Sequence, residues 1–310
     1  MKILLVLVAA AAVVILAAGY YVFMTACRRK GQMPWDDPDA LAKTQWAPLA
    51  DRIRDAARYL NDHNALDIYT VSHDGLKLHG KWLPAENAVG TILLFHGYRS
   101  CFLSDFAVFI PFYHNLGFNL LLADQRSHGK SEGKYITFGI RERKDVLAWI
   151  RYLNEHMGGR PAYLGGMSMG AATVLMASGE DLPSNVRGVI ADCGFTSPGE
   201  IIGEVMVRAK VPRFPLLQVA GIYSRLLAGF DLREYSTLDA MAVCKVPVLL
   251  IHGLDDHFVP CRMSREAFEA CNSEKRLILV EGASHGTACL TDRSRCQRAL
   301  TDFLMDHLAY

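Results

Sequence analysis

The chain has 310 residues, enough for one large α/β domain or two ordinary ones, and 51% of them are hydrophobic, which excludes wholesale disorder. Lysine and arginine number 33 and aspartate and glutamate 32, giving a net charge of +1. This balance argues against nucleic acid as the main partner, because phosphate binding needs clustered cations. The eight cysteines lie at irregular spacings without a C-x-x-C pair, which is typical neither of a disulfide scaffold nor of a structural zinc site.

The amino-terminal segment from Ile3 to Ala26 contains no charged residue, and the cations Arg28, Arg29 and Lys30 follow it. As a helix this run would be about 36 Å long, enough to cross a hydrocarbon core of about 30 Å. The alternative is a cleaved signal peptide, but the apolar run is long for one and lacks a clear small-x-small cleavage site. We therefore predict an anchor over residues 1–30 that crosses the membrane through residues 3–26.

The charges that flank this span indicate its orientation. Three cations follow the span and only the side chain of Lys2 precedes it, so the positive-inside tendency places the body of the chain in the cytoplasm. Only two residues precede the span, so the comparison of cations on its two sides favours the cytoplasmic orientation only slightly. The prediction is a single-pass protein of the cell membrane.

Residues 31–65 are predicted to form a juxtamembrane linker and one short helix. Proline and aspartate are frequent in the linker, and in the helix apolar residues recur at helical spacing at Leu49, Ile53, Ala56, Ala57 and Leu60. We expect this helix to pack on the following sheet rather than to contact the membrane. A chain starting near Gln32 is accordingly expected to be soluble and active.

Residues 66–310 alternate between strand and helix patterns. Asp74-Gly75 lies between two alternating runs and predicts a hairpin, and the later strands are short apolar runs, as is typical of strands buried on both faces. The predicted strands are Asp67–Ser72, Leu76–Trp82, Thr91–Phe95, Asn119–Ala123, Ala162–Gly165, Val186–Asp192, Val248–Ile251 and Arg276–Val280. The predicted helices are Ser104–Asn115, Gly139–Asn154, Ser168–Ala177, Cys261–Ala270 and Asp292–Leu308. This order predicts an α/β fold with a mostly parallel, doubly wound sheet.

More than fifty residues separate the strand that ends at Asp192 from the strand that begins at Val248, and many of them are apolar. An ordinary crossover between parallel strands needs far fewer. We predict a small helical cap, about residues 195–235, that lies over the carboxyl edge of the sheet. An ordinary surface excursion is the alternative.

The segment Gly166-Met167-Ser168-Met169-Gly170 has the form G-x-S-x-G and lies between a predicted strand and a predicted helix. A serine at such a turn adopts a strained backbone, and flanking glycines leave room for the helix to approach the strand. The amino terminus of the helix also stabilises negative charge that develops beside the serine. A glycine-rich structural turn is the alternative to a nucleophilic serine.

A nucleophilic serine needs a base and an acid that orients the base. Asp255 and Asp256 follow one later strand and His285 follows the last one, so all of them are expected at the carboxyl edge near Ser168. The chain order serine, aspartate, histidine is that of the α/β-hydrolases. His252, Asp255, Asp256 and His257 lack a recognised metal-binding spacing, and no metal or cofactor is predicted.

From about Asp67 to Leu308 the chain resembles the serine α/β-hydrolases, in the group described as serine aminopeptidase-like or lysophospholipase-like. The motifs that carry the resemblance are His96-Gly97-Tyr98, Asp124 to Ser131, the serine turn, and the loops of Asp256 and His285. The resemblance implies the α/β-hydrolase fold, with Ser168 as nucleophile, His285 as general base and Asp256 as orienting carboxylate. Asp256 fits the H-G-x-x-D spacing of the family, and Asp255 is the alternative.

The resemblance further implies an oxyanion hole formed by the backbone N–H groups of Tyr98 and Met169. We expect a serine hydrolase that cleaves an ester or thioester of a lipophilic small molecule, because the cap is apolar and the anchor keeps the site near lipid. The alternatives are a peptidase or amidase of the serine aminopeptidase type and a non-catalytic binding protein of the same fold. Phe214, Leu217 and Ile222 are the predicted wall of the acyl pocket.

Overall fold

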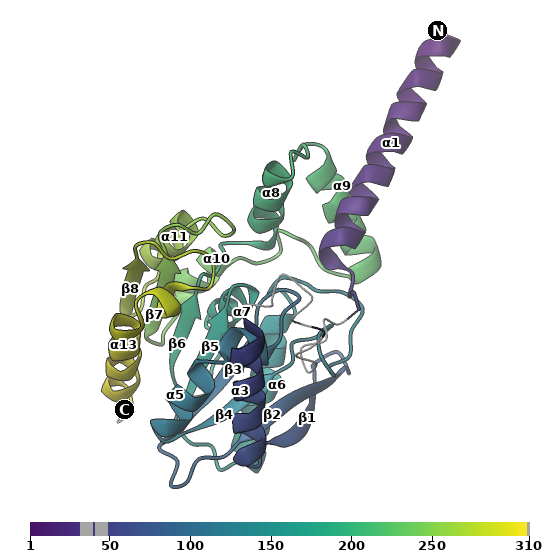
Figure 1. Ribbon diagram of the computed structural model, residues 1–310. Coiled ribbons are helices and arrows are strands. Elements are labelled where there is room, and N and C mark those ends of the chain that lie inside the picture. The colour runs from purple at the N-terminus through teal and green to yellow at the C-terminus, as the bar shows by residue number, and fades with distance from the viewer. Residues whose placement is uncertain (32–39, 41–48, 309–310) are drawn as a thin grey trace.

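The computed structural model describes residues 1–31, 40 and 49–308, and the predicted linker lies mostly outside them (Figure 1). Eight strands form one sheet in the order β1-β2-β4-β3-β5-β6-β7-β8. The strands are β1 (Leu66–Val71), β2 (Lys77–Leu83), β3 (Gly90–Phe95), β4 (Phe118–Ala123), β5 (Ala162–Met167), β6 (Val186–Asp192), β7 (Val248–Gly253) and β8 (Lys275–Val280). β2 pairs antiparallel with β1 and β4, and every pair from β4 to β8 is parallel. The predicted mostly parallel sheet is thus confirmed.

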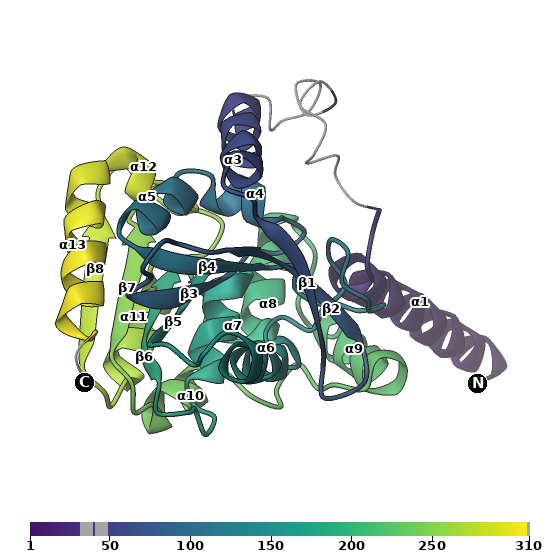
Figure 2. The same ribbon diagram turned by 90° about the horizontal axis from the view of Figure 1, so that it is seen from below.

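Helices cover both faces of the sheet (Figure 2). One face carries α3 (Ala50–Asp62), α4 (Phe102–Phe106), α5 (Phe109–Asn115), α12 (Ala288–Thr291) and α13 (Arg293–Asp306). The other carries α6 (Glu142–His156), α7 (Met169–Ala177), α10 (Thr237–Val243) and α11 (Arg262–Ala270). The single helix predicted over 104–115 is instead two short helices, and α10 and α12 had not been predicted.

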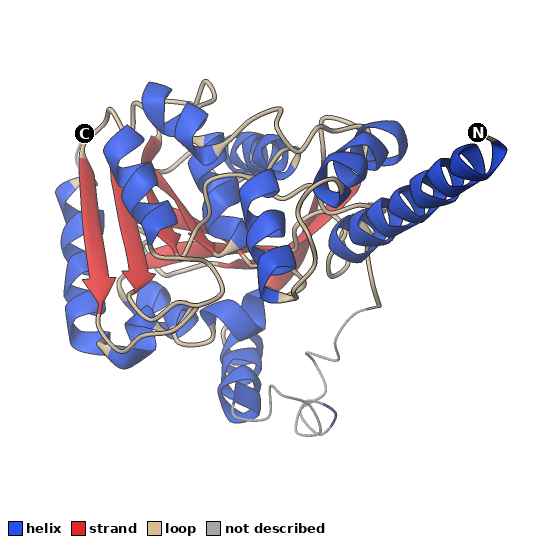
Figure 3. Ribbon diagram, turned by 90° about the horizontal axis from the view of Figure 1, so that it is seen from above, coloured by secondary structure: helices blue, strands red, loops and turns tan. Residues whose placement is uncertain are grey.

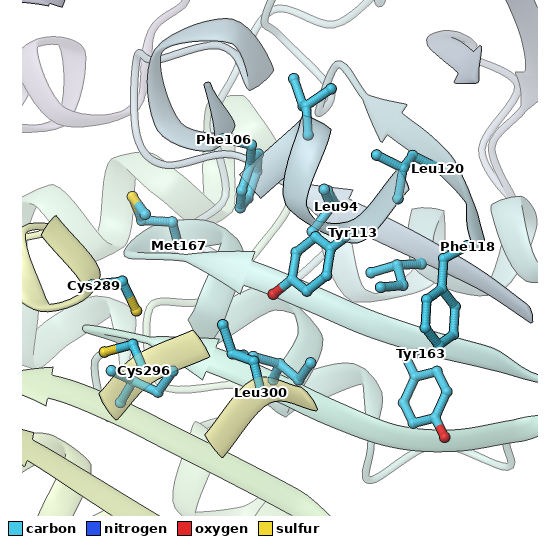
Figure 4. Packing of buried hydrophobic residues seen from close by; sticks show 14 of the residues in the cluster. Leu94, Phe106, Tyr113, Phe118, Leu120, Tyr163, Met167, Cys289, Cys296 and Leu300 are labelled. Atoms are coloured by element: carbon cyan, nitrogen blue, oxygen red, sulfur yellow. The ribbon is translucent and has the colours of Figure 1, made fainter. Parts of the chain in front are cut away.

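Strand β3 shows why the central strands are mostly apolar. Ile92 and Leu94 belong to the core beneath α3, α5 and α13, whereas Leu93 and Phe95 belong to the core beneath α6 and α7. Because successive side chains of a strand point to opposite faces, a strand covered on both sides is apolar on both of its faces. Figure 4 shows the first of these cores, in which Phe106 and Tyr113 lie near Leu94.

The helix predicted just before the sheet is present as α3, and it packs on the domain. Ile53, Ala56 and Leu60 are buried, and Ala56 and Leu60 join the core of the α5 face. Its charged residues lie on the opposite, solvent-facing side, with Arg54 and Asp51 paired at 2.6 Å. This arrangement agrees with packing on the sheet rather than with membrane contact.

The insertion between β6 and β7 contains α8 (Pro198–Arg208), α9 (Leu216–Tyr223) and the π-helical turn η2 (Ser224–Ala228), which lie beyond the carboxyl edge of the sheet (Figures 1 and 3). Ser197 starts α8 by accepting a hydrogen bond from the Glu200 N–H at 3.2 Å. Side-chain caps of this kind satisfy N–H groups that the first turn of a helix leaves unpaired.

The first helix, α1 (Lys2–Cys27), is long and apolar enough to cross a membrane, and most of it projects away from the domain (Figure 1). Its last turns, however, pack against α9, where the Tyr20 and Tyr223 rings are 5.2 Å apart. Phe23 and Cys27 are each only 1% exposed. Removal of the residues before Gln32 would uncover the apolar surface that these turns cover, and the solubility and activity of a chain starting near Gln32 stay a prediction.

Candidate active site

Ser168 stands at the junction between β5 and α7, with a φ of 55° and a ψ of −114°. Positive φ is strained for a residue with a Cβ atom, and such strain is typical of functional sites. The two flanking glycines allow this turn: a Cβ on Gly166 would overlap the backbone of Gly170, and a Cβ on Gly170 would overlap the carbonyl of Phe95. The sequence G-x-S-x-G thus lets α7 start directly against β3 and β5.

The structure brings Ser168, His285 and Asp256 together from three separate loops. His285 Nε2 lies 3.0 Å from Ser168 Oγ, and His285 Nδ1 lies 2.7 Å from Asp256 Oδ2. Ser168 and Asp256 are buried, while His285 is partly open to solvent. A hydroxyl, an imidazole and a carboxylate linked in this way can activate the hydroxyl as a nucleophile, because the imidazole accepts its proton while the carboxylate holds the ring in place.

Asp256 is positioned by both of its carboxylate oxygens. Oδ1 accepts hydrogen bonds from the Phe258 and Val259 N–H groups, each at 2.8 Å, and His252 Nε2 lies 3.2 Å from Oδ2. Burial opposes ionisation of Asp256, but its hydrogen bonds with His252 and His285 outweigh burial and hold the pKa of this carboxyl below its ordinary value. Asp255, the sequence-based alternative, is exposed, whereas Asp256 is buried.

The loop after β3 lies directly beside the serine. A Cβ on Gly97 would be 3.3 Å from the Cβ of Ser168, and the Gly97 N–H donates to Asp105 Oδ2 at 2.6 Å. His96 is fully buried beneath this loop, where its Nδ1 lies 2.8 Å from the Gly97 carbonyl oxygen. Tyr98 follows in this loop, and Met169 is the first residue of α7, so both backbone segments predicted for an oxyanion hole border Ser168.

Two cavities meet at Ser168, and both also contact Tyr98 and Phe258. The first, of about 480 Å³, is bordered by α3, α4 and the His285 loop, and carries polar groups from Arg52, Ser100, Ser104 and Asp105. The second, of about 680 Å³, is lined mainly by apolar residues of α1, α8 and the loops beneath them. Phe258, whose ring centroid is 5.0 Å from that of His285, had not been identified from the sequence.

Phe214, Leu217 and Ile222 do not line either cavity at Ser168, which corrects the sequence-based choice of acyl wall. Phe214 is 76% exposed and Ile222 is 48% exposed, and Leu217 borders a different hollow beside Arg213 and Tyr235. The cap residues that do face Ser168 lie mostly one helix earlier in the chain: Phe195, Ile201, Ile202, Val205, Met206, Ala209, Val211 and Leu216. The apolar composition of the insertion was visible in the sequence, but the phase of its helices was not.

Within the described residues, two groups of side chains have donor atoms close enough to share a metal ion. One joins Cys193 to Asp256 and His285, but burial raises the pKa of the Cys193 thiol well above its ordinary value, and metals bind the thiolate. The other joins His73 to Asp74 and Asp145, whose carboxylates are already paired with Arg126 at 2.9 and 2.6 Å. Neither donor set favours a metal.

Asp192, at the end of β6, is a buried carboxyl beside these residues. Its oxygens receive no N–H or O–H hydrogen bond from the residues that the structure describes. Burial raises the pKa of this carboxyl to about 6, with the nearby His252 and His285 acting in the opposite direction. The ordinary value in an unfolded chain is about 4.

The contribution of Asp192 to stability is therefore expected to fall as the pH rises from about 4 to about 6, because the folded state binds this proton more tightly than the unfolded state. Above that range the penalty is constant, of the order of 3 kcal/mol. Urea denaturation should show that Asp192→Asn has a higher free energy of unfolding than the unsubstituted protein at pH 8. Near pH 4 the two free energies of unfolding should be nearly equal. Asp255→Asn, at an exposed site, is the control. An equal effect of Asp192→Asn at both pH values would contradict this account.

Residues 90–221 match the alpha/beta hydrolase fold family. The uncharacterized protein YqkD of Bacillus subtilis (strain 168) is 28% identical over 232 residues, which cover 74% of this chain and 76% of that protein. The uncharacterized protein YfhR of Escherichia coli (strain K12) is 27% identical over 256 residues, which cover 79% of this chain and 82% of that protein.

Among solved structures, the chain is similar to the esterase Pf2001 of Pyrococcus furiosus, with 25% identity and a TM-score of 0.65 over 81% of this chain and 94% of that one. It also resembles Est1E from Butyrivibrio proteoclasticus, solved with ferulic acid bound, with 18% identity and a TM-score of 0.58 over 78% and 100%. At 18% identity the likeness shows the fold alone. The protein therefore has the α/β-hydrolase fold with esterases among its structural neighbours, which supports a hydrolase activity.

Proposed function

We propose that this protein is a membrane-anchored serine hydrolase that cleaves an ester or thioester of a lipophilic acid through an acyl-enzyme. The observation that carries this proposal is the hydrogen-bonded chain from Ser168 through His285 to Asp256, which lies where two cavities meet. An ester has an acyl arm and an alcohol arm on either side of its carbonyl carbon. Cavities on both sides of one nucleophile suit a substrate of that form.

In the proposed mechanism, His285 Nε2 takes the proton of Ser168 as Oγ attacks the carbonyl carbon. Negative charge then develops on the carbonyl oxygen, and the N–H groups of Tyr98 and Met169 donate hydrogen bonds to it. The C–O or C–S bond breaks as His285 returns the proton to the leaving alcohol or thiol. Water, deprotonated by the same ring, attacks the acyl-enzyme and releases the acid and the free serine. Asp256 keeps the ring oriented and stabilises its charged form throughout.

We further propose that α1 is retained as the anchor and is not a cleaved signal. Its end is attached to the domain: the Ile136 N–H donates to the Cys27 carbonyl at 2.6 Å, and the Arg29 N–H donates to the Lys134 carbonyl at 2.9 Å. The Arg29 guanidinium also donates to the carbonyls of Gly129 and Ser131. The cations after the span favour a domain on the cytoplasmic side.

The full-length protein, solubilised from carbonate-washed membranes, should hydrolyse p-nitrophenyl esters. For esters whose acyl-enzyme is hydrolysed more slowly than it forms, turnover should begin with a burst of p-nitrophenol equal to the enzyme concentration. Mass spectrometry of the same sample should recover peptides that precede Gln32. Aminoacyl p-nitroanilides form the control arm, and their preferential hydrolysis would favour the peptidase alternative. No turnover of either substrate and no reaction with a fluorophosphonate would contradict a serine hydrolase.

A further inference from the structure

The larger cavity at Ser168 has one wall that comes from the apolar first helix. From α1 it is lined by Ala18, Tyr21, Val22, Thr25 and Ala26. These residues recur at spacings of three and four, so they form one stripe along the last two turns of the helix. A segment expected only to tether the domain thus borders the space beside the candidate nucleophile.

Specific contacts hold this stripe in place. The Tyr98 hydroxyl donates to the Ala26 carbonyl at 2.7 Å, and the Arg99 guanidinium donates to the Thr25 carbonyl at 2.6 Å. On the other side of the helix, Phe23 is buried against Tyr135, with ring centroids 5.5 Å apart. Tyr98 also lines both cavities at Ser168, so it joins the end of α1 directly to the site.

The chemistry of the lining selects the ligand. The volume of about 680 Å³ lies within the range of ordinary ligand sites, which is roughly 300–1,000 Å³. Apart from Ser168 and the aromatic hydroxyls, its polar side chains are Thr25 and Arg99, and Arg99 is already bound to the Thr25 carbonyl. Alkyl chains suit such a lining, whereas a cationic group would lose its hydration and find no acidic side chain among the described residues that line the cavity.

The mouth of this cavity lies beside the helix. Tyr21 and Val205 both line the cavity, and they are 71% and 40% exposed. Beyond them, α9, which packs against α1, and η2, which follows α9 in the chain, expose further large apolar side chains at Ile222, Leu226 and Leu227. A ligand leaving the cavity therefore meets an apolar rim that is continuous with a helix of membrane-spanning length.

We infer that the last two turns of α1 form a wall of the acyl-binding cavity, so that the chain of a long-chain ester lies along this helix and enters from the lipid side. This inference rests on the proposed function, with Ser168 as nucleophile and α1 in the membrane. It assigns α1 a part in substrate selection in addition to attachment.

The test compares Ala18→Trp with Ala17→Trp in the full-length, detergent-solubilised protein. Ala18 lines the cavity, whereas its neighbour Ala17 is exposed on the same helix and does not. The indole should exclude several methylenes, each worth about fourfold in kcat/KM. We expect Ala18→Trp to lower kcat/KM for p-nitrophenyl palmitate at least tenfold relative to p-nitrophenyl acetate, and Ala17→Trp to leave that ratio unchanged.

A second pair of variants distinguishes a change in the cavity from a general loss of structure in Ala18→Trp. Val22→Ala enlarges the same wall and should move the preferred acyl chain to greater length, while Val14→Ala, at an exposed position, should not. If both Ala18→Trp and Val22→Ala keep the chain-length preference of the unsubstituted protein and still hydrolyse the acetate ester, α1 has no part in substrate selection, while the proposed serine hydrolase function stands. Absence of acetate hydrolysis and of fluorophosphonate labelling in the unsubstituted protein would instead overturn the proposed function.

Discussion

Ser168→Ala is expected to abolish labelling by a fluorophosphonate probe and to lower kcat for p-nitrophenyl esters by a factor of the order of 10⁴–10⁶. The serine oxygen is the atom that would attack the ester, and its partner in the site is His285 at 3.0 Å. Alanine keeps the Cβ atom in the tight space between Gly97 and the turn, so the fold should persist.

The matched control is Ser178→Ala, which removes a hydroxyl from the residue that ends the same helix. The Ser178 Oγ donates to the Leu175 carbonyl at 2.7 Å and is remote from the catalytic geometry. Labelling should be retained in this variant. Full labelling of a folded Ser168→Ala protein would remove Ser168 from the proposed mechanism.

Asp256→Asn is expected to lower kcat by roughly 10⁴, by analogy with the same change in other triads. The Asp256 Oδ1 accepts from the Phe258 and Val259 N–H groups, and an asparagine oxygen can keep both bonds. The amide NH₂ would then face His285 Nδ1 and donate to it. The ring proton is thereby forced onto Nε2, which can no longer accept the proton of Ser168.

Asp255→Asn provides the comparison, because it makes the same chemical change one residue away at an exposed side chain. Its kcat should remain near that of the unsubstituted protein. Both variants can be measured by burst and steady-state kinetics after circular dichroism has shown that they are folded. The reverse ranking of the two would transfer the orienting role to Asp255.

Local sequence patterns predicted the sheet and the serine turn well, and the physical reason is that both depend on short-range constraints. A strand covered on both faces, such as β3, is apolar on both of its faces, and consecutive apolar residues such as Ile92 to Phe95 result. The turn at Ser168 requires glycine at positions 166 and 170, because a Cβ there would overlap backbone. The choice of Asp256 over Asp255 came instead from the resemblance, whose H-G-x-x-D pattern Asp256 fits, and the structure places Asp256 Oδ2 2.7 Å from His285 Nδ1.

Only the tertiary structure decided which apolar residues face the site. The first helix is apolar on all sides, so its sequence identifies no face that binds the domain. One stripe of α1 faces the cavity at Ser168 because contacts with α9 and Tyr98, and the burial of Phe23, hold the helix in one orientation about its own axis. The phase of α9 depends on the same packing, which is why Ile222 is exposed, and Phe214, just before α9, is exposed as well. Composition determined that the cap and the first helix would be apolar. Contacts between segments almost two hundred residues apart determined what they enclose.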